Sequence, residues 1–208
     1  PPLNLGYVAA LTPPGWTIRI IDENLRQEDG TAWAPHLVGI TTLTPTAPRA
    51  YMLATQYRAQ GATVVLGGMH ASVLPDEAAQ YANCVVIGDA ETTWPRLIAD
   101  FVAGTPNRIY RGEFLPLDGL VSPRRDLYPA GYWAESIITS RGCTNACEFC
   151  SVSRFSGRRY HTRPIDEVID ELEQLPAHRP LLFTDDNFTL DRRRALALCR
   201  RMVERSVR

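Results

Sequence analysis

Residues 136–150 read SIITSRGCTNACEFC and contain three of the five cysteines of the chain. The segment 136–140 is dominated by β-branched and small residues, which predicts a strand. The thiols of Cys143, Cys147 and Cys150 follow directly in a C-x3-C-x2-C pattern. A strand that leads into a loop with three crowded thiols is the feature from which the fold class and the chemistry can be inferred.

The cysteine spacing favours an iron–sulfur cluster. Three thiolates on one short loop can hold three irons of a [4Fe–4S] cube and leave the fourth iron open for a substrate. A structural zinc site would take a fourth protein ligand, and the nearest candidate is His161, eleven residues beyond Cys150. Three thiols within eight residues, in an odd total, make a poor disulfide framework. Cys84 and Cys199 fall in a predicted strand and on the apolar face of a predicted helix, so we expect core thiols.

The composition is typical of a globular protein that buries a core. Of the 208 residues, 45% are hydrophobic and 22% are charged, and a net charge of −1 argues neither for nor against a polyanionic partner. No run of about 18 apolar residues occurs, so no membrane span is expected. Residues 1–6 lack the basic start and apolar centre of a signal peptide, so we expect a cytoplasmic protein.

The N-terminal half alternates strand and helix patterns. Short β-branched runs predict strands, and apolar residues at helical spacing predict helices. The expected strands cover residues 17–21, 37–42, 63–66 and 84–87, and the expected helices cover 50–57, a short stretch from Pro75, and 94–102. Strands followed by helices at this pace predict βαβ units, and hence a Rossmann-like α/β fold with a parallel sheet and helices on its faces.

Three segments that follow the predicted strands are rich in Gly, Pro and Thr: Thr42–Arg49, Gly67–Leu74 and Gly88–Thr92. In parallel α/β sheets, ligands bind beyond the carboxyl ends of the strands. We therefore expect these segments to be loops whose backbone approaches a ligand.

The strand–helix alternation stops after the fourth strand and its helix. Repeated prolines and glycines make residues 111–134 a predicted linker between a first domain (1–110) and a second (135–208). In the second domain we expect a strand at 136–140, a helix begun by Pro164, a strand at 181–184 and a last helix capped by Asp191.

The cysteine loop resembles the signature of the radical S-adenosylmethionine (SAM) superfamily, including the aromatic Phe149 before the last cysteine. The resemblance covers residues 136–205 and implies that this region is the start of a partial (β/α) barrel. It implies that Cys143, Cys147 and Cys150 ligate a [4Fe–4S] cluster whose open iron binds SAM. An electron from the cluster would split SAM, and the resulting 5′-deoxyadenosyl radical would abstract hydrogen from the substrate.

The same resemblance assigns further side chains to SAM. Phe149 would contact the adenine region, and Asp185 and Asp186 would accept hydrogen bonds from the SAM amino group. The alternative for the two aspartates is a turn followed by a helix cap. Four arginines flank the loop and could pair with the SAM carboxylate or an anionic substrate, or could be solvated: Arg154, Arg158, Arg159 and Arg163.

The N-terminal half is similar to the cobalamin-binding domain of B12-dependent radical SAM proteins. The similarity rests on Pro1-Pro2-Leu3 before a helix, Asp22-Glu23-Asn24 after a strand, Gly67-Gly68-Met69-His70-Ala71, and Gly88-Asp89-Ala90-Glu91. It implies cobalamin contacts from seven residues at the strand ends: Thr42, Thr44, Gly67, Gly68, His70, Gly88 and Glu91.

One departure concerns the lower axial ligand of the cobalt. The D-x-H-x-x-G motif of many cobalamin proteins is missing, because Ala34 stands where the aspartate would precede His36. We therefore expect no protein imidazole below the cobalt. His70 could face the corrin, or it could be a loop histidine near the surface.

Together the two resemblances imply a radical SAM enzyme with cobalamin as its second cofactor, which methylates an unactivated carbon. The alternatives are a non-methylating rearrangement, cyclisation or oxidation, and, in another class, a non-catalytic iron–sulfur or corrinoid sensor. The tRNA methylthiotransferases carry cluster cysteines in their first domain, whereas residues 1–140 contain only Cys84. The Arg-rich residues 154–163 lack a pattern of stacking aromatics, so a nucleic-acid partner is not expected.

The resemblance also implies that the chain is a fragment. A cobalamin domain of this type would have a first strand before Pro1, and most of the barrel would follow the last helix. Substrate-binding residues belong to that remainder, so we expect an unidentified small-molecule or lipid-like substrate. The electron would come from a donor such as flavodoxin or ferredoxin.

Overall fold

The computed structural model describes residues 1–25 and 33–207, without the side chain of Arg154. By their contacts, the residues form two units. The sheet unit is Leu11–Phe114, and the cysteine-loop unit combines Pro1–Ala10 with Leu115–Arg208.

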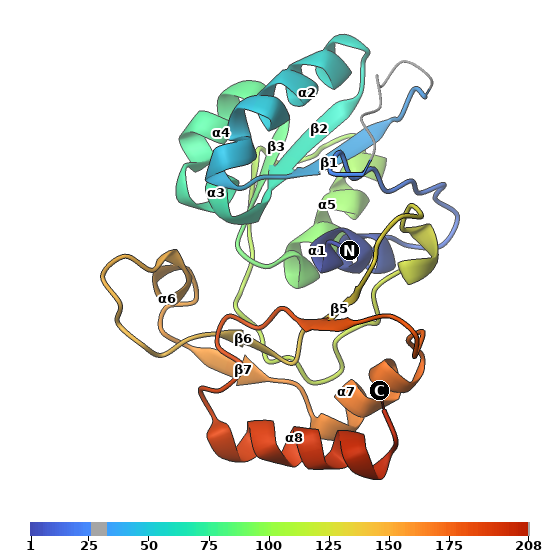
Figure 1. Ribbon diagram of the computed structural model, residues 1–208. Helices are drawn as coiled ribbons and strands as arrows, with labels where there is room; N and C mark the ends of the chain where they lie inside the picture. The colour runs from blue at the N-terminus through green and yellow to red at the C-terminus, as the bar shows by residue number, and fades with distance from the viewer. Residues whose placement is uncertain (26–32, 208) are drawn as a thin grey trace. The chain divides into compact units, whose positions relative to one another are not determined.

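A four-stranded parallel sheet forms the centre of the sheet unit (Figure 1). Its strands are β1 (Leu37–Thr41), β2 (Thr63–Gly67), β3 (Cys84–Ile87) and β4 (Ile109–Arg111), in the order β1-β2-β3-β4. All neighbouring strands pair in parallel, with Gly39 opposite Val65 and Val85 opposite Ile109. The predicted parallel α/β fold is confirmed, and β4 is a strand that the sequence did not predict.

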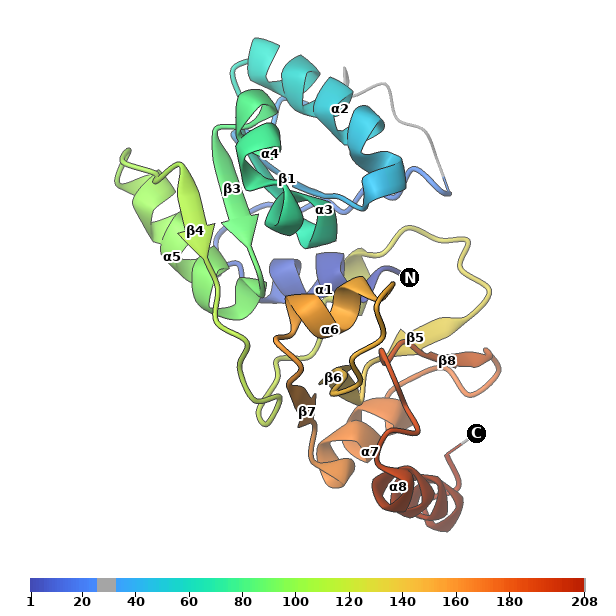
Figure 2. The same ribbon diagram turned by 90° about the vertical axis from the view of Figure 1, so that its left-hand side faces the viewer.

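Helices cover both faces of this sheet (Figure 2). One face carries α2 (Ala47–Ala59), α3 (Gly68–Val73) and α4 (Pro75–Tyr81), and the other carries α5 (Ala90–Val102). A 3-10 turn, η1 (Thr44–Thr46), precedes α2. The expectation of loops after the strands is therefore wrong in part. Gly68, with a φ of +88°, turns the chain so sharply that α3 begins without a loop.

The two faces of the sheet take alternate residues of each strand, as the pleat requires. The core between the sheet and α2–α4 contains side chains from three strands: Val38, Ile40, Val64, Leu66 and Val85. Gly39 faces the opposite side, where a Cβ atom on it would lie 3.1 Å from the ring of Trp94 in α5. The missing side chain at residue 39 thus lets the indole lie directly against β1.

The strand predicted at residues 17–21 is wrong for the described structure. Thr17 and Arg19 are exposed while Ile18 and Ile20 are partly buried, which is the alternation of a strand. No described strand, however, pairs with this segment. Because a strand also needs ladder hydrogen bonds to a neighbour, the alternation alone does not make one.

The cysteine-loop unit includes α1 (Leu3–Ala10), which contacts the segment around η2 (Arg125–Leu127). The N–H of Arg124 donates to the Gly6 carbonyl at 3.1 Å, and the Tyr128 hydroxyl donates to the Pro2 carbonyl at 3.3 Å. A Cβ atom on Gly6 would clash with the Tyr128 ring. Gly6 therefore provides the room in which the aromatic ring packs on α1.

Two small sheets follow in this unit. β5 (Glu135–Ile137) pairs in parallel with β8 (Leu181–Phe183), and β6 (Ser140–Gly142) pairs antiparallel with β7 (Tyr160–Thr162). The single strand predicted at 136–140 is thus two short ones. The chain leaves the first sheet at Thr139, whose N–H donates to the Asp185 carboxylate instead of a strand carbonyl.

The α-helices that follow α1 in this unit are α6 (Ser151–Phe155), α7 (Ile165–Glu173) and α8 (Arg192–Glu204). Figure 1 shows α7 and α8 next to each other, and their residues are in contact. The predicted cap of the last helix is confirmed, because Asp191 Oδ1 accepts from the N–H of Arg194 at 3.0 Å. None of the helices in the described part of the chain is long and apolar enough to cross a membrane.

An apolar core joins the strands of this unit to α7 and α8. Its fully or nearly fully buried members are Ile137, Val168, Ile169, Leu172 and Leu198. The prediction that Cys199 is a core thiol is wrong, because the residue is exposed. Leu198 fills the core, and one residue along a helix turns about 100°, which takes the next side chain out of it. Cys84 is buried, as predicted.

Two buried carboxylates bind three arginines in the cysteine-loop unit. Glu171 accepts from Arg125 at 2.6 Å and from Arg163 at 2.7 Å. Glu135 accepts from Arg125 at 3.2 Å and from Arg179 at 2.8 Å. Because buried charges are tolerated only when they are paired, these contacts fix the segment around Arg125 against β5 and α7.

We expect Glu171→Gln to destabilise the protein by about 3 kcal/mol, because Arg163, 3% exposed, loses its charged partner. Asp166→Asn is the control: its ion pair with Arg201 at 3.3 Å is exposed, so a change below about 0.5 kcal/mol is expected. Urea denaturation measures both, and equal effects of the two substitutions would contradict the assignment.

Candidate cofactor sites

Thr42 ties the carboxyl ends of β1 and β2 to the start of α3. Its N–H and its hydroxyl both donate to the Gly67 carbonyl, at 2.8 and 2.9 Å. Its carbonyl accepts from the N–H of His70 at 3.1 Å, and its hydroxyl accepts from the N–H of Ala71 at 3.2 Å. The residue is fully buried. Thr42, which was predicted to contact cobalamin, therefore has its hydroxyl bound to backbone on two sides.

Gly68 occupies a position that admits no side chain. Its φ of +88° is unfavourable for other residues, and a Cβ atom would lie 2.8 Å from both Thr41 Oγ1 and the Thr42 carbonyl oxygen. At Gly67 a Cβ atom would meet only ordinary contacts, the nearest to Val86 at 3.7 Å. The second glycine of the pair is thus the one that the backbone requires.

Ser72 links the ends of β2 and β3, and no local sequence motif indicates this role. Its hydroxyl donates to the Gly68 carbonyl at 2.8 Å and accepts from the N–H of Gly88 at 3.0 Å. Gly88 has a φ of +82°, and Glu91 lies in the first turn of α5. The three predicted glycines therefore lie at one edge of the sheet, with Ser72 between two of them.

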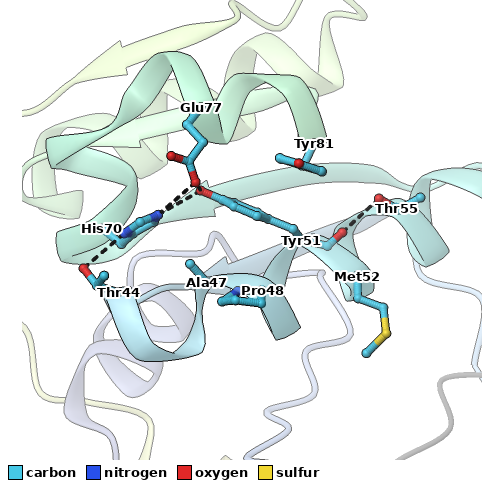
Figure 3. Close-up of a pocket in the computed structure, with 9 residues that line it drawn as sticks. All are labelled: Thr44, Ala47, Pro48, Tyr51, Met52, Thr55, His70, Glu77 and Tyr81. Carbon is cyan, nitrogen blue, oxygen red and sulfur yellow. Dashed lines mark hydrogen bonds and ion pairs between the residues drawn. The ribbon is translucent and has the colours of Figure 1, made fainter.

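His70 belongs to a chain of hydrogen-bonded side chains in the sheet unit (Figure 3). The Tyr51 hydroxyl donates to Glu77 Oε1 at 3.0 Å, so it can only accept from His70 Nε2 at 2.9 Å. The other ring nitrogen, Nδ1, forms a hydrogen bond with the Thr44 hydroxyl at 3.1 Å. His70 lies in α3 and is 5% exposed, so the alternative of a surface loop histidine is wrong.

A cavity of about 500 Å³ borders this chain of side chains. It is lined by Thr44, Ala47, Pro48, Tyr51, Met52, Thr55, His70, Glu77 and Tyr81. The rings of Tyr51 and Tyr81 stack with centroids 4.1 Å apart. Burial, and then the hydrogen bond to Glu77, raises the pKa of Tyr51 to about 12, so its phenol remains a donor at neutral pH. Thr44 and His70 are the predicted site residues here; Tyr51 and Glu77 come from two helices and no local motif indicates them.

The three loop cysteines differ in exposure. Cys143 is buried, Cys150 is partly buried and Cys147 is exposed, and the N–H of Cys150 donates to the Cys147 carbonyl at 3.1 Å. Within residues 1–25 and 33–207, no three His, Cys, Asp or Glu side chains lie close enough to hold a metal ion. The structure therefore places the three thiols on one loop, but not close enough to one another to share a metal ion. As a set of soft donors, three free thiols fit an iron–sulfur cluster.

Asp185 and Asp186 hold the backbone that leads into the cysteine loop. Asp185 accepts from the Thr139 N–H at 3.1 Å, the Thr139 hydroxyl at 2.9 Å and the Ser140 hydroxyl. Asp186 accepts from the N–H of Gly142 at 2.7 Å. Their predicted contact with SAM remains a prediction, and the structure gives each carboxylate a protein partner that the sequence did not suggest.

The other side chains near the loop that were candidates for binding SAM, substrate or zinc differ in exposure and in their contacts. Phe149 is 93% exposed. Arg163 is wrong as a candidate for pairing with SAM or substrate, because it is buried and bound to Glu171. The side chain of Arg154 lies outside the described residues. His161, the candidate fourth zinc ligand, contacts the Leu115 carbonyl through Nδ1 at 2.6 Å.

Gly68→Ala is expected to destabilise the protein by about 2 kcal/mol, because the added Cβ atom meets backbone at 2.8 Å in a strained conformation. Gly104→Ala is the matched control: its φ of +75° is similar, but a Cβ atom there meets nothing within 4 Å. In thermal denaturation, Gly68→Ala should have a clearly lower melting temperature than Gly104→Ala. The opposite order would contradict the close approach of Gly68 to Thr41 and Thr42.

Tyr51→Phe is expected to cost about 1 kcal/mol, since it removes the hydroxyl that is hydrogen-bonded to both His70 Nε2 and Glu77 Oε1. In Tyr81→Phe the stacked ring is kept, and the Tyr81 hydroxyl has no hydrogen-bond partner in the described part of the chain, so little change is expected. Urea denaturation of the two variants tests the chain of hydrogen bonds directly.

Comparison with known proteins gives a match for the first 98 residues of the chain. Residues 1–98 match the family model described as the B12 binding domain. All seven residues that were predicted to contact cobalamin lie within this stretch.

Curated relatives match along nearly the whole chain. Bacteriochlorophyllide d C-8(2)-methyltransferase from Chlorobaculum tepidum is 29% identical over 91% of this chain and 46% of its own length. The C-12(1)-methyltransferase of the same organism is 28% identical over 100% of this chain and 48% of its own. Hopanoid C-2 methylase from Rhodopseudomonas palustris is 27% identical over 98% of this chain.

The fold also has a solved counterpart. The radical SAM methyltransferase TsrM from Kitasatospora setae, solved with tryptophan substrate and a SAM analogue, superimposes with a TM-score of 0.76 at 24% identity. The match covers 98% of this chain and 48% of TsrM. The chain thus spans about half the length of the proteins that it matches. The chain is therefore similar to the B12 binding domain over residues 1–98 and to named methyltransferases along nearly its whole length, and it shares the fold of the matched half of TsrM.

Proposed function

We propose that this chain forms the cobalamin-binding and SAM-cleaving part of a cobalamin-dependent radical SAM methyltransferase. One observation carries the proposal: a B12-binding match over residues 1–98 is followed by a C-x3-C-x2-C loop at residues 143–150. Relatives aligned with 91% and 100% of the chain are methyltransferases by name, which supports the reaction class.

Cobalamin would bind at the carboxyl edge of the sheet. Gly68 and Gly88 offer backbone without side chains there, which suits the close approach of a large flat ring. Thr44, which is exposed in η1 shortly after β1, would offer its side chain at the same edge. Both ring nitrogens of His70 are bonded within the protein, which supports the expectation that no imidazole ligates the cobalt from below.

Cys143, Cys147 and Cys150 would hold a [4Fe–4S] cluster, which when bound would supply the electron that splits SAM. The exposed ring of Phe149 is available for the adenine of SAM. Asp186 is the better candidate of the two aspartates for the SAM amino group, because it is exposed and accepts from Gly142 alone among the hydrogen bonds described above. Asp185 already accepts from two residues.

The proposed reaction is methylation of an unactivated carbon in a small-molecule or lipid-like substrate. Relatives named for bacteriochlorophyllides and for a hopanoid support a substrate of this kind. A flavodoxin or ferredoxin would supply the electron that reduces the cluster. The chain spans about half the length of these relatives.

The test uses the full-length protein, reconstituted without oxygen with iron, sulfide and hydroxocobalamin. Optical and EPR spectra report the corrinoid and the cluster, and chromatography reports 5′-deoxyadenosine after addition of SAM and dithionite. We expect Cys147→Ala to lose most of its iron and all formation of 5′-deoxyadenosine. Cys199→Ala, which changes an exposed thiol outside the loop, should leave both unchanged.

Each part of the proposal can fail separately. A Cys147→Ala protein with full iron content would overturn the ligand assignment. A cluster without retained corrinoid would remove cobalamin and methyl transfer from it. Both cofactors without 5′-deoxyadenosine would indicate a sensor module, and 5′-deoxyadenosine without methyl transfer from labelled SAM would indicate a rearrangement, cyclisation or oxidation.

A further inference from the structure

We propose that Asn187 is a positioning residue for the iron–sulfur cluster, acting through a hydrogen bond to the sulfur of Cys143. The inference rests on the proposed function, because it concerns the cluster that the three cysteines would hold. It adds a residue that lies outside the cysteine motif, 44 positions further along the chain.

The contact is a single amide-to-sulfur hydrogen bond. The side-chain Nδ2 of Asn187 lies 3.6 Å from the Sγ atom of Cys143. Cys143 is 8% exposed, whereas Cys147 is exposed and Cys150 partly buried. Of the three loop thiols, the one that receives the amide N–H is therefore the one most shielded from water.

The turn that carries Asn187 is held firmly at both ends. Before it, the N–H of Thr184 donates to the Ile137 carbonyl at 2.9 Å. After it, the ring of Phe188 packs on Phe183 with centroids 4.8 Å apart. Asn187 therefore points at Cys143 from a rigid support, which is what a residue that orients a metal ligand requires.

The two aspartates beside Asn187 already perform the purely structural task. Asp185 holds Thr139 and Ser140, and Asp186 holds Gly142. Asn187 adds no further backbone contact to the loop among the hydrogen bonds of the described residues; its amide reaches the thiol itself. Asn187 thus interacts with the Cys143 sulfur and does not hold the backbone of the loop.

The direction of the hydrogen bond follows from the chemistry of an iron ligand. A metal-bound thiolate has no proton, so its sulfur can only accept, and only the Nδ2 end of the Asn187 amide can donate. The positive end of an N–H dipole stabilises the more negative, reduced form of the cluster. Hydrogen bonds to cluster sulfurs accordingly raise the reduction potential.

The experiment measures the cluster midpoint potential by EPR-monitored redox titration of the full-length reconstituted protein without SAM. Asn187→Leu keeps the size of the side chain and removes the donor, so we expect a full iron and sulfide content and a more negative potential. Asn187→Gln keeps an N–H donor and should return the potential toward that of the wild type. Asn145→Leu makes the same change at an exposed residue of the loop and should leave the potential unchanged.

If Asn187→Leu loses the cluster, the titration is repeated with Asn187→Asp. That variant also lacks the N–H donor, so a more negative potential is expected for it as well. An unchanged potential in a fully loaded Asn187→Leu or Asn187→Asp protein overturns the inference and leaves the proposed function intact. An equal shift in Asn145→Leu also overturns it, because loop polarity would then be the cause. Failure of the wild type to load a cluster overturns both.

Discussion

Thr139 is the point at which the chain passes from one small sheet to another, and two opposite charges hold it there. The Asp185 carboxylate accepts from its N–H and hydroxyl, while the Arg194 guanidinium donates to its carbonyl at 3.0 Å. Thr139 is fully buried, so every polar atom of this crossing has to be satisfied by the protein. The path of the cysteine loop, and therefore the position of Cys143, depends on this arrangement.

In the sheet unit, uncharged groups satisfy the polar backbone atoms at the strand ends. Thr42 and Ser72 bond the ends of neighbouring strands to the start of α3, and Gly68 allows the helix to begin without an intervening loop. The hydroxyls of Thr42 and Ser72 are therefore already hydrogen-bonded within the protein. What the edge offers to a cofactor is consequently glycine backbone and the exposed Thr44 rather than a row of polar side chains.

The sequence predicted those features that repeat or crowd along the chain. The β-branched runs located β1, β2 and β3, the apolar run at residues 181–184 located β8, and the thiol spacing located the cysteine loop. The alternation of polar and apolar residues at 17–21 gave a wrong strand prediction, because strand pairing depends on a neighbouring strand that the local sequence does not specify. The exposure of Cys199 and the burial of Arg163 were missed because each depends on a long-range fit, a helix rotation in one case and the Glu171 partner in the other. Asn187 and Ser72 were missed for the same reason: their partners are distant in sequence.

The hydrogen bonds from the turn after β8 have a consequence for protein engineering. A designer who transplants residues 143–150 into a new scaffold would carry over the three thiols but none of the groups that secure the first of them. Asp186 and Asn187 lie 44 residues downstream of their partners and on a different strand connection. The portable module is therefore the cysteine loop together with both small sheets, and any shorter graft would have to recreate the support from the host protein.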